Sequence, residues 1–382
     1  MNGIIFNSGE DYKEVRRFTL RTLRDLGFGK KNSEGMILEE CKNIVDAIKK
    51  RIDNTKNGVV DIDNLLNKAA VNVVWNITAG ERFDYDEERM NNLYKFVDMF
   101  VILGTKVHGK PLGSFPFLKY FPPYRSIYNG VYRGLAECRK FIVSTIESHE
   151  ETMDEDNPRD FIDKFLIAGK LSKALSKEAL LFTCFDLFTA GSETTSNSLI
   201  YAILMMMRNP DIQTKVREEI NEVSKGRELV NISDKDKCHY TEAVLNEVWR
   251  FCNILILPLP RKFSIPTIIK NHEIPKNAVY LTNIYSVHMD QEYWKDPEVF
   301  RPERFMQDGK FRVDERNIPF GIGKRRCIGE SLARMENFLF FATMIKHFKF
   351  SCVGGVMPDT RPVGGLTNRP APFLMKVEQI IL

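Results

Sequence analysis

The sequence feature that most constrains the fold is a long segment, Lys177 to Arg208, that is apolar on nearly all sides. As a helix it would extend about 45 Å, and a helix without a polar face must be surrounded by protein. Ser176 can cap its start and Asn209 precedes a stop, with Pro210 well placed to open a second helix that ends near Gly226. The segment therefore predicts a helix through the centre of a large domain.

Proline divides the rest of the chain. None occurs before Pro111, whereas 11 of the 17 fall between Pro258 and Pro372. We expect the first two thirds to be mainly helical and the last third richer in loops and short strands, a mainly α (α+β) fold. Helical patterns cover about residues 13–26, 33–53, 61–80, 87–105 and 126–150, and residues 111–123 predict a proline-broken connection.

Composition excludes several classes of protein. The 382 residues are 43% hydrophobic and 28% charged, which are ordinary globular values, and a net charge of +4 gives no indication of nucleic-acid binding. The seven cysteines are widely spaced without a Cys-x-x-Cys, which argues against a disulfide framework and a cysteine-rich zinc site. The short apolar run at the N-terminus cannot span a membrane, so nothing in the chain as written anchors it.

The densest unusual segment runs from Pro319 to Arg334 and contains Cys327. Glycines permit a tight loop, and the helical pattern after Cys327 places its sulfur near a helix N-terminus. Backbone N–H groups there, together with the neighbouring basic side chains of residues 324–326, predict a lowered thiol pKa. Cys327 is therefore a candidate thiolate.

A thiolate can be a nucleophile, a zinc ligand or a haem ligand, and the alternative is an inert cysteine after a glycine turn. No His lies in a recognisable protease signature, and zinc lacks its other ligands in any familiar spacing. The haem interpretation uses more of the loop. The glycines let a flat macrocycle approach the backbone, Phe320 can pack under it, and Arg325 can meet a propionate.

The stretch Phe320-Gly-Ile-Gly-Lys-Arg-Arg-Cys327-Ile-Gly329 resembles the cysteine loop of the cytochrome P450 family of haem-thiolate monooxygenases. Three other motifs stand in the family's order, namely Ala190 to Thr195, Glu247 to Arg250, and Pro302 to Phe305. The details look most like the microsomal drug- and lipid-oxidising branch. The resemblance implies one P450 domain over residues 1–382, lacking the family's anchor and first helices and strands.

The resemblance also implies the activity. The expected enzyme is a monooxygenase that uses haem b and O2 to oxidise a lipophilic xenobiotic, fatty acid or steroid-like molecule. Its electrons would come from NADPH through cytochrome P450 reductase, with cytochrome b5 as a second donor. It implies the cytoplasmic face of the endoplasmic reticulum membrane, with a cytoplasmic location as the alternative for an anchorless chain. The rival functions are a catalytically silent haem-binding remnant and a helical interaction scaffold.

Site residues follow from the same resemblance. Cys327 would ligate the iron, Thr194 would deliver protons during oxygen activation with Glu193 as its acidic partner, and these two would locally interrupt the central helix. The remaining expected haem contacts are Arg325, Arg261, Arg16, Tyr12, Phe320, Gly321, Gly329, Ala190 and Gly191. Tyr12 stands where the family has Trp. A structural ion triad is expected from Glu247, Arg250 and Arg304.

Two further sets are expected by resemblance. An apolar substrate pocket would be lined by Phe188, Leu255, Leu257, Leu259 and Leu366. A basic surface for the electron donor would comprise Lys13, Arg17, Arg21, Arg24, Lys30, Lys324 and Arg334. Each Leu is equally well explained as buried core, and the basic residues as a solvated helix face.

Overall fold

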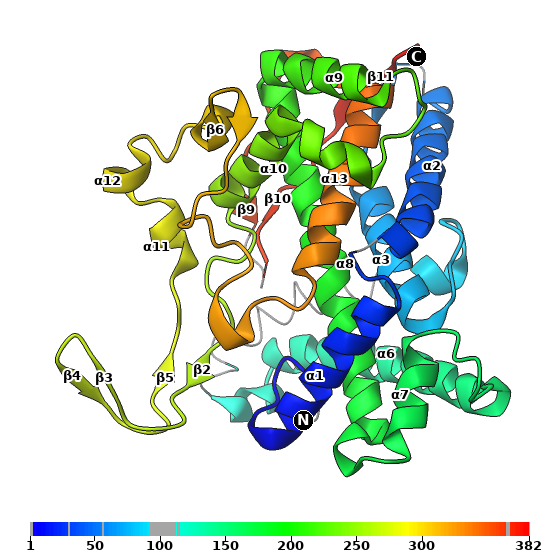
Figure 1. Cartoon of the computed structure of the whole chain (residues 1–382), viewed down its shortest axis with the longest axis vertical. Helices are drawn as coiled ribbons and strands as arrows, with labels where there is room; N and C mark the ends of the chain where they lie inside the picture. Colours follow the sequence, from blue (N-terminus) through cyan, green and yellow to red (C-terminus); the bar gives the residue numbers. More distant parts are fainter. Residues whose placement is uncertain are drawn as a thin grey trace.

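The computed structural model describes residues 3–29, 31–55, 57–91, 93, 112, 115–363 and 367–381 (Figure 1). Its helices confirm the mainly helical fold. They are α1 (Gly9–Asp25), α2 (Lys31–Asp53), α3 (Asp63–Ala79), α6 (Tyr124–Thr152), α7 (Phe161–Gly169), α8 (Lys177–Arg208), α9 (Pro210–Ser224), α10 (His239–Cys252), α11 (Ile284–His288), α12 (Gln291–Trp294) and α13 (Glu330–His347). Most of the helix expected over residues 87–105 lies outside the described residues.

Helix α8 runs through the middle of the molecule, with α3, α10 and α13 around it (Figure 1). Its start and end follow the expected signals. The Ser176 side chain accepts a hydrogen bond from the Ala179 N–H, and Pro210 occupies the first turn of α9. Almost every side chain from Ala179 to Met207 is buried, which explains why the segment needs no polar face.

The strands are short, as the proline-rich last third predicts, and the structure pairs them antiparallel. The largest sheet has the order β1-β11-β8, and four two-stranded pairs accompany it. The strands are β1 (Val59–Val60), β2 (Arg261–Lys262), β3 (Thr267–Ile269), β4 (His272–Ile274), β5 (Val279–Tyr280), β6 (Met306–Gln307), β7 (Lys310–Phe311), β8 (Phe348–Cys352), β9 (Pro362–Val363), β10 (Arg369–Pro370) and β11 (Met375–Gln379). The hairpin of β3 and β4 projects away from the helices (Figure 1).

Six short 3-10 helices complete the described elements. They are η1 (Pro116–Tyr120), η2 (Lys173–Leu175), η3 (Ile232–Lys237), η4 (Pro302–Phe305), η5 (Gly323–Arg325) and η6 (Val353–Gly355). Within the described part of the chain, none of the helices is both long enough and apolar enough to cross a membrane.

Candidate functional site

The Cys327 loop is a tight turn that leads into α13. The Cys327 N–H donates to the Phe320 carbonyl oxygen over 2.9 Å and closes the loop. Gly321 and Gly323 have φ of 71° and 72°, a left-handed conformation that glycine adopts without strain. Cys327 is exposed, whereas five of the other six cysteines are buried. The loop therefore places an accessible cysteine a few residues before the N-terminus of α13.

The expectation of a lowered thiol pKa is wrong for this arrangement. Burial raises the pKa of Cys327 above its ordinary value, although the Gly329 N–H and the charge of Arg16 act to lower it. The residue is accessible to solvent, but protein atoms crowd around its sulfur and leave a thiolate poorly hydrated. The neighbouring Arg326 does not offset this effect, because it pairs with Glu330 through a 2.7 Å hydrogen bond.

Three guanidinium groups and a phenol gather beside this loop. The Arg16 Nη2 donates to the Arg326 carbonyl oxygen over 2.6 Å, and the Arg325 guanidinium carbon lies 3.4 Å from the centre of the Tyr12 ring. Burial lowers the pKa of Arg261, and the nearby positive charges of Arg325 and Arg16 lower it further. The structure thus brings together the four residues that the sequence assigned to haem propionates.

This cluster fits an anionic ligand. Among the described residues, none of the three guanidiniums forms an ion pair with a carboxylate, and Arg261 and Arg325 donate instead to the carbonyl oxygens of Ile5 and Asn7. The Tyr12 hydroxyl is buried and has no hydrogen-bond partner among the residues that the structure describes. Because like charges repel and a buried hydroxyl without a partner costs free energy, the cluster has the donor set that a group with two carboxylates would satisfy.

The central helix presents one accessible stripe. Ala190 is exposed and Thr194, one turn later, is half-buried, although their neighbours on α8 are mostly buried. The Thr194 hydroxyl donates to the Ala190 carbonyl oxygen over 2.7 Å. Glu193 is buried. A small residue and a hydroxyl thus face open space at mid-helix.

Two expectations about this part of α8 are wrong. The helix is not interrupted at Glu193 and Thr194, because the hydroxyls of Ser192 and Thr194 bond back to carbonyls four residues earlier without breaking the helix. The space beside Gly191 is already filled. A Cβ added there would lie 2.8 Å from the Val74 Cγ2 atom of α3, so Gly191 allows two helices to approach rather than a cofactor.

The expected ion triad is assembled. Glu247 and Arg250 are wholly buried, and the Arg250 Nε and Nη2 donate to the two Glu247 oxygens over 2.6 and 2.7 Å. The Arg304 Nε lies 3.4 Å from Glu247 Oε1, and the Arg301 N–H donates to the same oxygen over 2.9 Å. Arg250 also donates to the carbonyl oxygens of His288 and Pro297. The triad therefore ties α10 to the segment before the Cys327 loop.

Sequence reasoning missed His288, which connects this triad to the loop. Its side chain is buried, its Nδ1 lies 2.9 Å from Asn253 Oδ1, and its Nε2 accepts from the Ile318 N–H over 3.0 Å. Burial lowers the pKa of His288 to about 4, with the charge of Arg250 acting in the same direction. His288 is consequently neutral, with Nδ1 carrying the proton. No motif marks it, because its partners are distant in sequence.

The predicted substrate pocket is supported unevenly. Leu257 is exposed and Leu255 and Leu259 are half-buried, so all three are accessible. The expectation for Phe188 is wrong, because its side chain is only 1% exposed and its ring packs 5.7 Å from that of Trp75. Phe188 belongs to the core between α8 and α3. Leu366 lies outside the described residues.

The predicted basic surface is partly exposed. Lys13, Arg17, Arg21 and Arg24 form an exposed face of α1, with Lys13 paired to Glu10. Lys324 is exposed, whereas Lys30 lies outside the described residues. Arg334 is partly buried, with its side chain 28% exposed and its guanidinium against the rings of Trp249 and Phe320.

Asp186 is another residue that the sequence did not single out. It lies buried on α8, and its Oδ2 accepts from the N–H groups of Ile4 and Ile5 over 2.6 and 2.9 Å. Burial raises the pKa of Asp186 to about 6, against the effect of those two hydrogen bonds. Asp186 thus anchors the segment before α1 to the central helix.

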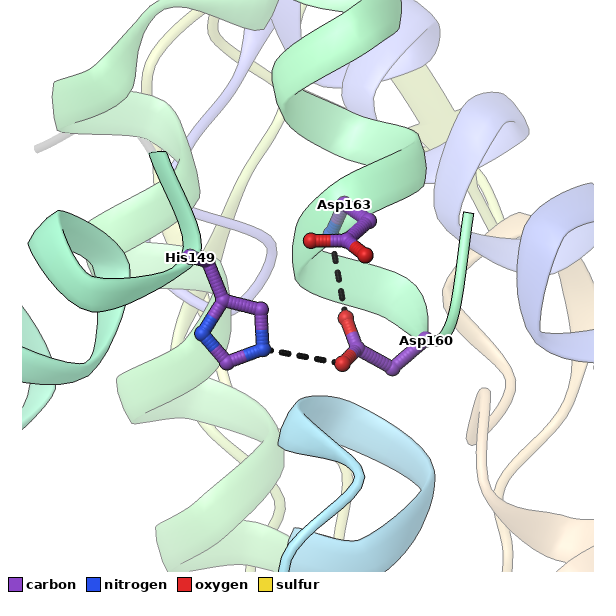
Figure 2. A group of neighbouring side chains, drawn as sticks. All are labelled: His149, Asp160 and Asp163. Atoms are coloured by element: carbon purple, nitrogen blue, oxygen red, sulfur yellow. Dashed lines mark hydrogen bonds and ion pairs between the residues drawn. The ribbon is translucent and has the colours of Figure 1, made fainter. Parts of the chain in front are cut away.

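His149, Asp160 and Asp163 form a compact group at the junction of α6 and α7 (Figure 2). The His149 Nε2 lies 2.8 Å from Asp160 Oδ2 and its Nδ1 lies 2.8 Å from the Thr145 carbonyl oxygen, so both nitrogens carry protons. Burial opposes protonation, but Asp160 outweighs it and raises the pKa of His149. Asp163 is paired with Arg159. The group is therefore a structural ion pair and leaves no imidazole lone pair for a metal ion.

Comparison with known proteins bears on what this arrangement does. The family model described as Cytochrome P450 matches residues 1–377. Cytochrome P450 2J3 of Rattus norvegicus is 37% identical over 356 residues, which cover 91% of this chain and 69% of that protein. Cytochrome P450 2J2 of Homo sapiens is 35% identical with the same coverage of both chains. Cytochrome P450 2C25 of Mesocricetus auratus is 35% identical over 97% of this chain and 76% of that protein.

Proposed function

Because this chain belongs to the cytochrome P450 family, we propose that it inserts one oxygen atom from O2 into a lipophilic xenobiotic, fatty acid or steroid-like substrate, with electrons from NADPH passed on by a reductase. It is a haem-thiolate monooxygenase, an oxidoreductase whose cofactor is haem iron. The observation that carries the proposal is the accessible Cys327 beside three guanidiniums that form no ion pair with a carboxylate within the described part of the chain.

Cys327 is the proposed iron ligand. When bound, haem activates dioxygen, and a thiolate ligand favours O–O cleavage by donating electron density. The raised pKa of the Cys327 thiol is compatible with this role, because a metal ion deprotonates a coordinating thiol outright. Phe320, Gly321 and Gly329 of the same loop are the proposed haem contacts beside it. The hydrogen bond from the Cys327 N–H to the Phe320 carbonyl oxygen holds the backbone of the loop.

The haem propionates are the proposed partners of Arg16, Arg261 and Arg325. Their charges and the unpartnered Tyr12 hydroxyl supply donors for two carboxylates. Ala190, which is exposed on α8, is the proposed small surface against which a flat group could pack.

Thr194 and Glu193 are the proposed proton-transfer residues. The Thr194 hydroxyl is held by the Ala190 carbonyl oxygen, and threonine in a helix has two accessible χ1 rotamers, so it can turn toward the open side of α8. We expect Thr194→Ala to consume reductant without forming a matching amount of product. Thr189→Ala is the matched control, because Thr189 makes the same back-bond to the Phe185 carbonyl oxygen. Unchanged coupling in Thr194→Ala would contradict the role.

Electron transfer is proposed to use the exposed basic face of α1 together with Lys324. Positive charge there attracts an acidic donor and raises its rate of association. Cytochrome P450 reductase is the proposed donor, with cytochrome b5 as a second one, at the cytoplasmic face of the endoplasmic reticulum membrane. Turnover driven by reductase should fall more steeply with salt than turnover driven by peroxide, and equal sensitivity would argue against docking.

The decisive experiment is spectroscopic. The reduced carbon-monoxide complex of the haem-loaded chain should show the red-shifted Soret band of a thiolate ligand, and Cys327→His should abolish it. Cys352→Ser is the control, because Cys352 is the other cysteine that is not fully buried. Retention of the band in Cys327→His would refute the assignment. The band without product formation would instead favour a catalytically silent haem protein.

A further inference from the structure

Arg334 lies in a corner formed by two aromatic rings from different parts of the chain. Its guanidinium carbon is 4.8 Å from the centre of the Trp249 ring and 4.9 Å from that of Phe320. The two rings meet edge to face, with centroids 5.4 Å apart. A guanidinium at these distances is attracted to both ring faces, and the attraction grows as water is removed. We call these three side chains the aromatic corner.

The aromatic corner joins three structural elements. Trp249 belongs to α10 and is 3% exposed, Arg334 belongs to α13, and Phe320 belongs to the Cys327 loop. Trp249 lies between Glu247 and Arg250, so the helix that holds the buried ion triad also supplies this ring. The corner therefore connects a rigid buried network to the loop.

The guanidinium is held in place from its other side. The Arg334 Nε donates to Glu330 Oε1 over 3.0 Å, and Arg326 binds the same carboxylate. Burial acts to raise the pKa of Glu330, but the hydrogen bonds from Arg326 and Arg334 outweigh it and hold the pKa below its ordinary value. Glu330 is thus charged at neutral pH and fixes the orientation of the Arg334 guanidinium over the rings.

Phe320 is the residue through which the corner reaches the thiol. Its carbonyl oxygen accepts the Cys327 N–H over 2.9 Å, the bond that closes the loop. A shift of the Phe320 ring would move this carbonyl and therefore the Cys327 backbone. We propose that Arg334 and Trp249 are positioning residues that fix Phe320 and thereby hold the Cys327 loop in its closed turn.

The hydrogen bonds of the Cys327 loop can be measured without following turnover. Hydrogen exchange of the Cys327, Arg326 and Gly321 amides reports the loop hydrogen bonds directly. In the haem-loaded protein, Arg334→Met and Trp249→Leu should each accelerate this exchange about five- to thirtyfold, the factor expected for a lost desolvated cation–π contact. The same variants should lose the thiolate-type Soret band at lower urea concentration.

A matched control is available in the same molecule. The Arg316 guanidinium carbon lies 4.0 Å from the centre of the Tyr293 ring, but its side chain is half exposed and neither residue belongs to the Cys327 loop. Arg316→Met should leave loop exchange at the wild-type rate. Arg334→Lys keeps the charge but not the planar group, so its exchange should lie between wild type and Arg334→Met.

The double variant distinguishes a joint role from two separate ones. If Arg334 acts together with Trp249, Arg334→Met in the Trp249→Leu background should change loop exchange by less than twofold. Full independent effects in the double variant would overturn the proposal, as would loop exchange within twofold of wild type in both single variants. Exchange of the α6 amides verifies that each variant is folded. If Arg334→Met does not fold, Trp249→Leu and Arg334→Lys decide between these outcomes.

Discussion

Replacement of Gly191 by alanine tests whether this glycine serves helix packing or leaves room for a cofactor. The added Cβ would lie 2.8 Å from Val74 Cγ2, and the branched Val74 side chain, 6% exposed on α3, has little freedom to move. Overpacking of this kind costs about 1–3 kcal/mol. Alanine also gains about 1 kcal/mol of helix propensity over glycine. The net loss in the free energy of unfolding is therefore about 0–2 kcal/mol.

The coupling free energy between residues 191 and 74 tests the packing explanation more directly than the single variant does. Val74→Ala removes the methyl groups that the new Cβ would meet, and the propensity gain at residue 191 is the same with either residue at 74. The double variant should therefore be more stable than the sum of the single variants predicts, by about 1–3 kcal/mol, the cost of the overpacking that is relieved.

The assay is urea unfolding followed by circular dichroism, at equal haem saturation because a bound ligand adds to apparent stability. Gly35→Ala is the control, since Gly35 lies in α2 and a Cβ there would meet nothing within 4 Å. It should stabilise the protein by about 0.5–1 kcal/mol. Additivity within about 0.5 kcal/mol at residues 191 and 74 would refute the packing explanation and restore the cofactor-side one.

Three other predictions concern buried titratable groups. His288 has a pKa of about 4 in the folded protein and about 6.5 when unfolded, so the contribution of neutral His288 to the free energy of unfolding is present above pH 6.5 and falls by about 2 kcal/mol by pH 5. In urea titrations at pH 6.5 and pH 5, His288→Gln should not show this pH-dependent loss. Burial raises the pKa of Glu336 to about 8, so its contribution to the free energy of unfolding is greatest below pH 4.5 and declines by about 3 kcal/mol between pH 5 and 7.5. If the free energy of unfolding of Glu336→Gln fell with pH as steeply as that of the wild type, this assignment would be contradicted. Asp186→Ala should accelerate exchange of the Ile4 and Ile5 amides more than tenfold, as expected for loss of hydrogen bonds to a charged group worth about 1.5 kcal/mol or more; unchanged exchange would show that the segment is held by other contacts.

Much of the fold was predictable because it depends on local signals. Ser176 and Pro210 mark the ends of the two helices where the structure has them, and the run of prolines after Pro258 limits the last third to short strands. The position of the Cys327 loop and the pairing of Glu247 with Arg250 also follow from spacing along the chain. Such features involve neighbours within a few residues, which the sequence states directly.

The environment of each side chain was decided by tertiary structure. Sequence placed Cys327 near a helix N-terminus and cations, but the surrounding protein outweighs both and raises the pKa of its thiol. Sequence indicated space for a cofactor beside Gly191, but in the structure Val74 of α3 fills that space. Sequence likewise indicated a surface charge at Arg334, but its guanidinium packs against Trp249 of α10. His288 and Asp186 bear no motif, because their partners lie 30 or more residues away.

The sequence by itself determined where the central helix and the helix after it begin, where the thiol-bearing turn lies and which family's motifs the chain carries, because these depend on residue type and spacing. Only the tertiary structure decided that Arg16, Arg261 and Arg325 have no carboxylate partner among the described residues, and that the Tyr12 hydroxyl near them is buried without a hydrogen-bond partner there. The physical reason is that desolvation and charge act through space, and a chain must be folded before distant residues share a low-dielectric environment.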